Sequence, residues 1–233
     1  MEAAPSAHET IVVVTGGDPV SVDERAKVPD AAFVVAADSG IEHAQALGLP
    51  VHVAVGDFDS VHPAALARAE AAGAAIERHP AAKDATDLEL ALDVALAHRP
   101  RRVVVLGGHG GRLDHLLANA TLLASPAYDE VEVVAHLGGA TVTVVRSEAA
   151  VHGAVGELVS LLAIHGAATG VRTEGLLYPL RREDLRPGST RGVSNELVAP
   201  TATVALDAGV LLVVQPGQLG THHLHVDPSR STP

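Results

Sequence analysis

Two acidic residues close together in the sequence could hold a metal ion at the end of a strand. Asp57 and Asp59, in the segment GDFDS, follow a run expected to form a strand at 51–55. Carboxylates at positions i and i+2 can point to the same side, and they repel each other unless a cation lies between them. Mg²⁺ prefers one or two carboxylates together with phosphate and water oxygens. The pair therefore favours a magnesium site, and a polar turn in which Asp and Ser bond their own backbone is the alternative.

A glycine-rich segment, GGHGGRLDH at 107–115, follows the strand expected at 102–106. Glycines let backbone N–H groups approach an anion closely, a helix N-terminus favours negative charge, and Arg112 offers a planar set of donors. These features predict a loop that binds phosphate, with a tight strand-to-helix turn as the alternative. Asp114 could complement the helix dipole, ligate a second metal ion or hold Arg112.

A third polar segment, KDATDLE, opens a predicted helix. Thr86 and Glu89 have the spacing of a capping box, which accounts for both without any ligand. Lys83 is one of two lysines in the chain and comes just before this helix, at a position where phosphate is favoured. We interpret Lys83 as a contact to a phosphate-bearing ligand.

These segments need a parallel sheet to bring them together, and the first half of the chain has the pattern of one. Short β-branched runs alternate with Ala/Leu-rich segments of helical period, as in sheets with crossover helices. Ligands of such sheets bind at the carboxyl ends of the strands, where the acids and glycines lie. The expected strands are 10–15, 32–37, 51–55 and 102–106, and the expected helices are 41–47, 63–72, 87–97 and 113–124. In the last helix, one apolar stripe is predicted from Leu113, Leu116, Leu117, Ala120 and Leu123.

The second half of the chain has a different pattern. From Glu130 onward the helical period fades, and short apolar runs between Gly, Pro and Asn turns indicate antiparallel β-structure. The change at Gly138-Gly139 fits a domain boundary. The expected organisation is an N-terminal tail at 1–9, an α/β domain at 10–138, a β domain at 139–217 and a C-terminal tail at 218–233.

Composition excludes several classes of protein. The 233 residues are 47% hydrophobic, which predicts a globular chain, and 28 acids against 16 Lys and Arg give a net charge of −12. This charge argues against a nucleic-acid-binding surface, because such surfaces neutralise phosphates with cations. The chain has no Cys, which excludes disulfides and thiolate metal sites. Without a secretory signal or a long apolar run, we expect a cytoplasmic protein with no membrane contact.

Seven segments, taken in order and spacing, resemble the signature blocks of the thiamine pyrophosphokinase family. The resemblance implies an N-terminal Rossmann-like α/β domain, a C-terminal antiparallel β-sandwich domain and a homodimer. It also implies transfer of a pyrophosphoryl group from ATP to the hydroxyethyl group of thiamine, with release of AMP. The blocks are AADSG (36–40), GDFDS (56–60), KDATDLE (83–89), GGHGGRLDHLLAN (107–119), GELVSLLAI (156–164), TEGLLYPL (173–180) and GVSNE (192–196).

The same resemblance implies roles for individual residues. The residues implied to bind Mg²⁺ or ATP phosphate are Asp57, Asp59 and Asp87, with Asp38 and Asp114 as further active-site acids. Phosphate contacts are implied for Arg112 and the loop glycines Gly108, Gly110 and Gly111, in addition to Lys83, which stands where other members have Gln. Thiamine contacts are implied for Tyr178, Ser194 and Asn195. Tyr178 occupies a position where Trp is common, and its ring keeps a flat face for a cationic heteroaromatic group.

Other functions fit part of the sequence. A pyrophosphokinase acting on another alcohol, such as a hydroxymethyl pterin, would use the same acids and glycine loop, and only the blocks GVSNE and GLLYPL favour thiamine. A module that binds a nucleotide or thiamine without catalysis is a second alternative, and the intact acids and Arg112 argue against it. His222, His223 and His225 could hold a metal ion, although the Gly, Pro and Ser around them favour a solvated tail.

Overall fold

The protein is built on a large mixed sheet and a smaller antiparallel sheet. The computed structural model describes residues 9–30, 32–82, 84–110 and 112–217. In the described residues the large sheet has ten strands in the order β12-β9-β14-β7-β6-β5-β1-β2-β3-β4, and the small one has the order β11-β10-β13-β8. The strands are β1 Thr10–Val14, β2 Phe33–Ala37, β3 Val53–Gly56, β4 Ala75–Arg78, β5 Arg102–Leu106, β6 Glu132–Leu137, β7 Ala140–Val145, β8 Glu148–His152, β9 Leu158–Ala163, β10 Ala168–Glu174, β11 Arg181–Leu185, β12 Asn195–Glu196, β13 Thr201–Ala205 and β14 Leu211–Gln215.

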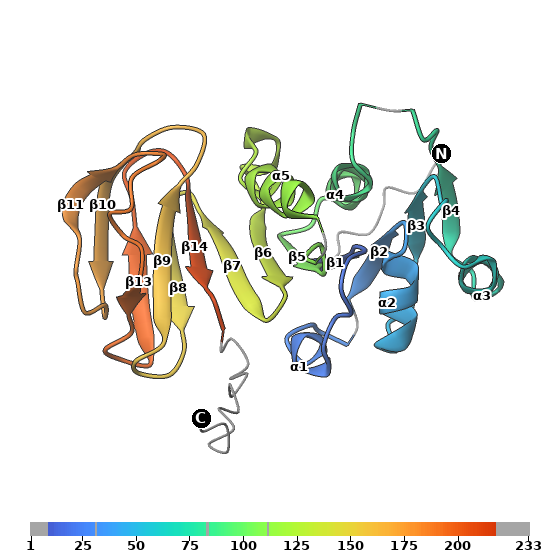
Figure 1. Ribbon diagram of the computed structural model, residues 1–233, viewed down its shortest axis with the longest axis horizontal. Helices are drawn as coiled ribbons and strands as arrows, with labels where there is room; N and C mark the ends of the chain where they lie inside the picture. Colours follow the sequence, from blue (N-terminus) through green and yellow to red (C-terminus); the bar gives the residue numbers. More distant parts are fainter. Residues whose placement is uncertain (1–8, 31, 83, 111, 218–233) are drawn as a thin grey trace, which may run out of the picture.

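Strands β1 to β6 pair in parallel and carry helices on both faces. The helices are α1 Val22–Arg25, α2 Gly40–Ala46, α3 Pro63–Ala71, α4 Asp87–Ala97, α5 Leu113–Leu123 and the 3₁₀ turn η1 Pro126–Tyr128. Figure 1 shows α4 and α5 on one face and α1 and α2 on the other. The central strands are buried on both sides because their side chains alternate between two hydrophobic clusters, as for Val13 and Val12 of β1.

The second half continues the same sheet and adds the small one. A two-residue turn at Gly138 and Gly139 joins β6 to the antiparallel strand β7, and β14, β9 and β12 extend the sheet from there. Side chains from both sheets share one hydrophobic cluster, with Leu161 and Val213 from the large sheet and Val171 and Val204 from the small sheet. This shared cluster holds the small sheet against the antiparallel end of the large one (Figure 1).

The mixed α/β class, with a separate antiparallel sheet, is confirmed. The four expected strands and four expected helices are present within one or two residues of their predicted ends. The helix α1 and the edge strand β4 were not predicted. The run VEVVAH was expected to form an antiparallel strand. This expectation is wrong, because the run forms β6, which pairs in parallel with β5 before the chain reverses direction at the turn. The expected domain boundary at residue 138 stays a prediction. The large sheet contains strands from both sides of that residue.

The apolar stripe predicted on α5 is only partly buried. Leu123 is fully buried, whereas Leu113 is 68% exposed and Leu117 is 59% exposed. The period of the sequence was correctly assigned to a helix, but part of the apolar face has no cover in the described chain. No helix in the described residues is long and apolar enough to cross a membrane.

Candidate active site

Three carboxylates meet at the carboxyl ends of two neighbouring parallel strands. Asp38 follows β2, while Asp57 and Asp59 follow β3, and one oxygen from each lies within 4.8 Å of the others. Parallel pairing of β2 with β3 brings these strand ends side by side. Such a set of hard oxygen donors suits a divalent cation of the Mg²⁺ type.

Asp38 is the most constrained of these acids. Its backbone is left-handed, with φ of 45°, and its carboxylate atom Oδ1 is buried without a hydrogen-bond partner in the described part of the chain. Burial raises the pKa of Asp38, and the negative charges of Asp87, Asp57 and Asp59 raise it further. A buried acceptor beside three like charges is satisfied by a cation, so the donor set fits Mg²⁺.

Asp87 joins this group from the first turn of α4. The side chain of Thr86 caps that helix by accepting a hydrogen bond from Glu89 N at 3.3 Å, which confirms the Thr86 half of the predicted capping box; the role of the Glu89 side chain in it stays a prediction. A Cβ built on Gly56 would lie 3.1 Å from Asp87 Oδ1 and 3.3 Å from Asp38 Cβ. Gly56 therefore leaves the space in which the two acids approach. The structure places Asp38, in addition to the expected Asp57 and Asp59, in the compact three-acid group, with Asp87 beside it.

The spacing of Asp57 and Asp59 has a local structural cause. Phe58 between them has φ of 62° and is buried in a hydrophobic cluster with residues of α3, whereas Asp57 is half-buried and Asp59 is exposed. Asp57 Oδ1 also accepts a hydrogen bond from Asp59 N at 3.2 Å, as the polar-turn alternative expects. The segment is thus a turn that holds two carboxylates on one side.

The glycine-rich loop between β5 and α5 lies at the same edge of the sheet. Gly108 N donates to Gly16 O at 2.8 Å, and Gly108 O accepts from Asn119 Nδ2 at 3.1 Å. The amides of His109 and Gly110 donate to no described residue, which leaves them available to an anion. A phosphate role for Gly108 stays a prediction, because its N–H is already donated. Gly111 and Lys83 lie outside the described residues.

Arg112 and Asp114 form an exposed ion pair at the start of α5. Arg112 Nε donates to Asp114 Oδ1 at 3.0 Å and Nη2 donates to Oδ2 at 2.6 Å. This pair lowers the pKa of Asp114 and raises that of Arg112. Asp114 therefore holds Arg112, and its place in the first turn of α5 also fits the role of complementing the helix dipole, whereas the metal-ligand role stays a prediction.

The loop after β1 was missed by the sequence reasoning. Asp18 N donates to His109 O at 2.8 Å, and a Cβ built on Gly110 would lie 2.4 Å from Asp18 Oδ1. Gly17 comes equally close to His109, since its Cβ would lie 2.2 Å from the carbonyl oxygen. The segment TGGDP could have indicated this loop, because paired glycines and an acid directly follow a predicted strand.

The three residues expected to contact thiamine lie together in the second half. Asn195 is 3% exposed; its Oδ1 accepts from Tyr178 N at 2.9 Å and its Nδ2 donates to Tyr178 O at 2.8 Å. This clamp fixes the backbone at Tyr178, whose side chain is 57% exposed. Ser194 has φ of 57° and donates its amide to Ser160 Oγ at 3.1 Å. The structure therefore brings these residues together and presents the Tyr178 ring outward.

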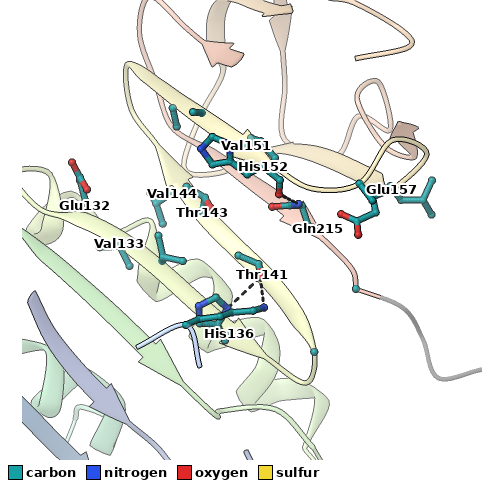
Figure 2. Close-up of a pocket in the computed structure, with 18 of the residues that line it drawn as sticks. Glu132, Val133, His136, Thr141, Thr143, Val144, Val151, His152, Glu157 and Gln215 are labelled. Atoms are coloured by element: carbon teal, nitrogen blue, oxygen red, sulfur yellow. Dashed lines mark hydrogen bonds between the residues drawn. The ribbon is translucent and has the colours of Figure 1, made fainter. Parts of the chain in front are cut away.

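A separate groove of about 1130 Å³ lies between the β6–β7 hairpin and β8. Figure 2 shows residues that line it: His136, Thr141 and Thr143 of the hairpin, together with His152, Glu157 and Gln215. None of the predicted site residues that the structure describes lines this groove. The expected acids and glycine loop lie elsewhere, at the carboxyl edge of the parallel strands, and the expected thiamine contacts lie around β12.

An α/β protein with clustered carboxylates and a glycine loop at this edge has the site of an enzyme that handles nucleotide phosphates. A family model described as "Thiamin pyrophosphokinase, catalytic domain" matches residues 26–135. A second, described as "Thiamin pyrophosphokinase, vitamin B1 binding domain", matches residues 141–211. Together they cover most of the chain, which belongs to the thiamine pyrophosphokinase family.

Individual relatives agree with this membership. The thiamine pyrophosphokinase of Bacillus subtilis is 29% identical over 194 residues, covering 80% of this chain and 84% of its own. The solved structure of the Bacillus subtilis enzyme has a TM-score of 0.79 and 27% identity, covering 90% of this chain and all of the other. That of Geobacillus thermodenitrificans has a TM-score of 0.74 and 27% identity, covering 91% and 99%.

Proposed function

We propose that this chain transfers the β,γ-diphosphoryl group of ATP to the hydroxyl of thiamine, giving thiamine diphosphate and AMP. The observation that carries the proposal is the acid cluster at the strand ends of a member of the thiamine pyrophosphokinase family. In this cluster one Asp38 oxygen is buried and has no hydrogen-bond partner among the described residues. The family models for the catalytic domain and for the vitamin B1 binding domain both match this chain, in that order along the sequence.

The acids are suited to hold the metal ion that accompanies ATP. Asp38, Asp57 and Asp59 would supply its carboxylate ligands, and Asp87 lies close enough to contribute charge or a further oxygen. Mg²⁺ bound there would neutralise charge on the phosphate oxygens during transfer. We assign no residue as a unique general base; the carboxylates would serve to orient the hydroxyl proton.

The glycine loop and Arg112 would position the phosphates. The amides of His109 and Gly110, at the approach to α5, favour an anion by direct donation and by the helix dipole. Arg112 is held by Asp114 and is exposed, so a phosphate can exchange for that carboxylate. In-line attack of the thiamine oxygen on the β-phosphorus then breaks its bond to the oxygen shared with the α-phosphorus, and AMP departs.

The two groups of site residues lie far apart within one chain, which favours a homodimer. Asn195 lies in β12 at one edge of the large sheet, whereas Asp38 follows β2. Seven strand-to-strand steps separate β12 from β2, which is roughly 34 Å along the sheet at the usual spacing. One substrate pair cannot touch both groups, so each site takes its acids from one subunit and its thiamine contacts from the other.

Exposed apolar side chains support the same assembly. Leu113 and Leu117 of α5 are exposed in the catalytic half. In the second half, exposed apolar residues lie around β12 and the segment paired with it: Leu158, Leu177, Tyr178, Val193 and Val198. Apolar patches of this kind mark contact surfaces, and in a two-fold dimer one patch of each subunit can cover the other patch of its partner. The cytoplasmic location, the Rossmann-like description and the sandwich description stay predictions.

The experiment is to measure AMP release from ATP in the presence of Mg²⁺ with each of two acceptors, thiamine and a hydroxymethyl pterin, and in a control without acceptor. The proposal expects AMP release that depends on thiamine. Release with the pterin alone would assign a different acceptor, and binding of both substrates with no AMP would indicate a binding module.

A further inference from the structure

One side chain connects the glycine-rich loop to the β6–β7 turn. The ring of His109 packs against Gly138, since a Cβ built on Gly138 would lie 2.5 Å from His109 Cδ2 and 3.0 Å from Nε2. His109 Nδ1 is buried and has no hydrogen-bond partner among the described residues. The ring therefore acts on the turn by packing, and its place is set by the space that Gly138 leaves.

The turn offers a fixed surface to this ring. Gly139 N donates to Oε1 of Glu24, a residue of α1 that is only 3% exposed. On another side, a Cβ built on Gly217 would lie 2.4 Å from Gly139 O, so the chain after β14 passes close to the turn. Contacts from two separate parts of the chain hold the turn in place.

The His109 ring is attached at the point where the loop has free donors. Gly107 N donates to His136 O at 3.2 Å and Gly108 N donates to Gly16 O at 2.8 Å, so these two amides are occupied. The amides of His109 and Gly110 donate to no described residue. The ring is attached through Cβ to the Cα of His109, which lies between these two N–H groups, so its position against Gly138 restricts the directions in which they point.

We infer that His109 is a positioning residue for ATP: its ring, packed against the Gly138-Gly139 turn, holds the amides of His109 and Gly110 toward the phosphates. This inference rests on the proposed function. It predicts that the Gly138-Gly139 turn, at the junction of the two halves of the chain, influences the affinity for ATP.

The turn supplies a matched pair of variants. Gly138→Ala and Gly139→Ala both place a side chain at positive φ, 62° and 84°, but a Cβ on Gly139 meets nothing within 4 Å. Affinity for ATP with Mg²⁺ is measured by calorimetry without thiamine, together with the KM of each substrate and the melting temperature. We expect Gly138→Ala to weaken ATP binding about tenfold more than Gly139→Ala does, with the KM of thiamine unchanged.

Variants of the ring test the same contact from the other side. His109→Ala should weaken ATP binding, and His109→Phe should restore most of that loss because it keeps a flat ring against Gly138. In the His109→Ala background, Gly138→Ala should weaken ATP binding no more than Gly139→Ala does, because the clash is gone. This series keeps the test decisive even if Gly138→Ala does not fold.

Equal ATP affinities of the two glycine variants would overturn the inference, as would additive effects of His109→Ala and Gly138→Ala. Failure of His109→Phe to rescue would also overturn it, because a ring nitrogen would then be the active feature. A wild-type protein that binds no ATP would refute the proposed function itself, whereas a wild type that turns over with an unresponsive Gly138 refutes only the role of His109.

Discussion

At the scale of single residues, the acid cluster places several carboxylates close together, which lowers the stability of the folded protein unless a cation is bound. Asp38 is partly buried next to three other carboxylates, and burial together with their charge raises its pKa. Such an arrangement is unfavourable without a cation, since like charges in a low-dielectric site repel. Residues of this kind mark functional sites, because selection for stability alone would remove them.

We predict that Asp38→Asn stabilises the protein in the absence of divalent cations and loses the stabilisation that Mg²⁺ provides. The variant keeps the shape of the side chain and removes one charge. We expect the free energy of unfolding without metal to rise by about 1 kcal/mol, which corresponds to a rise of about 2–4 °C in the melting temperature. Thermal unfolding with and without Mg²⁺ measures both effects. An equal Mg²⁺ response in the variant and the wild type would remove Asp38 from the metal site.

A second prediction concerns the exposed ring of Tyr178. If the ring faces the thiamine cation, Tyr178→Ala should raise the KM of thiamine about tenfold while leaving that of ATP unchanged, and Tyr178→Trp should keep or improve it. Steady-state kinetics with each substrate varied in turn gives the comparison. The melting temperature is the control, since a 57% exposed side chain contributes little to the core. Equal increases in both KM values would contradict a specific thiamine contact.

At the scale of the elements, the β6–β7 hairpin contains a buried histidine with a pH-dependent cost. His136 is 5% exposed, and its Nδ1 lies 3.2 Å from Thr141 Oγ1. Its pKa is lowered to about 4, mainly by burial; Lys27 and Arg102 act in the same direction and Glu24 opposes them. The folded protein therefore holds this side chain neutral.

The sign of the pH effect follows from proton binding. Between pH 6.5 and about 4 the unfolded chain binds a proton at His136 that the folded chain does not, so the free energy of unfolding falls as the pH falls. The loss is at most about 3 kcal/mol. Urea unfolding across this range should show a shallower pH dependence for His136→Gln than for the wild type. His152→Gln is the matched control, because that histidine also contacts a threonine hydroxyl, at 3.0 Å, but is exposed. Identical slopes for the wild type and His136→Gln would contradict the prediction.

Much of this arrangement could be predicted at the level of elements. Periodicity located the parallel strands, and parallel pairing alone requires that acids following neighbouring strands converge. The parallel pairing of β6 could not be predicted, because the pattern of VEVVAH is the same in either direction. The exposure of Leu113 could not be predicted either, because helical periodicity does not show whether another part of the protein covers the apolar face of the helix. The hydrogen bond from Gly108 N to Gly16 O could not be predicted either, because it joins two loops that are distant in sequence.

At the scale of the whole molecule, the roughly 34 Å between β12 and β2 makes a shared site the central architectural prediction. We expect mixtures of two inactive variants, Asp59→Asn and Tyr178→Lys, to regain activity after subunit exchange. Tyr178→Lys places a positive charge against the thiamine cation. Half of the dimers would be mixed, each with one intact site, so activity should return to about a quarter of the wild type. Exchange shown by mass without recovery of activity would place each site within one chain.

The most direct test of the whole account follows the phosphorus atoms of ATP by ³¹P NMR during the reaction with thiamine and Mg²⁺. The account predicts that AMP and thiamine diphosphate appear in equal amounts, that no ADP accumulates, and that Asp59→Asn slows both signals by several powers of ten, on the order of 10³ or more. ADP with thiamine monophosphate as the products, or an undiminished rate in Asp59→Asn, would contradict transfer of an intact diphosphoryl group at the acid cluster.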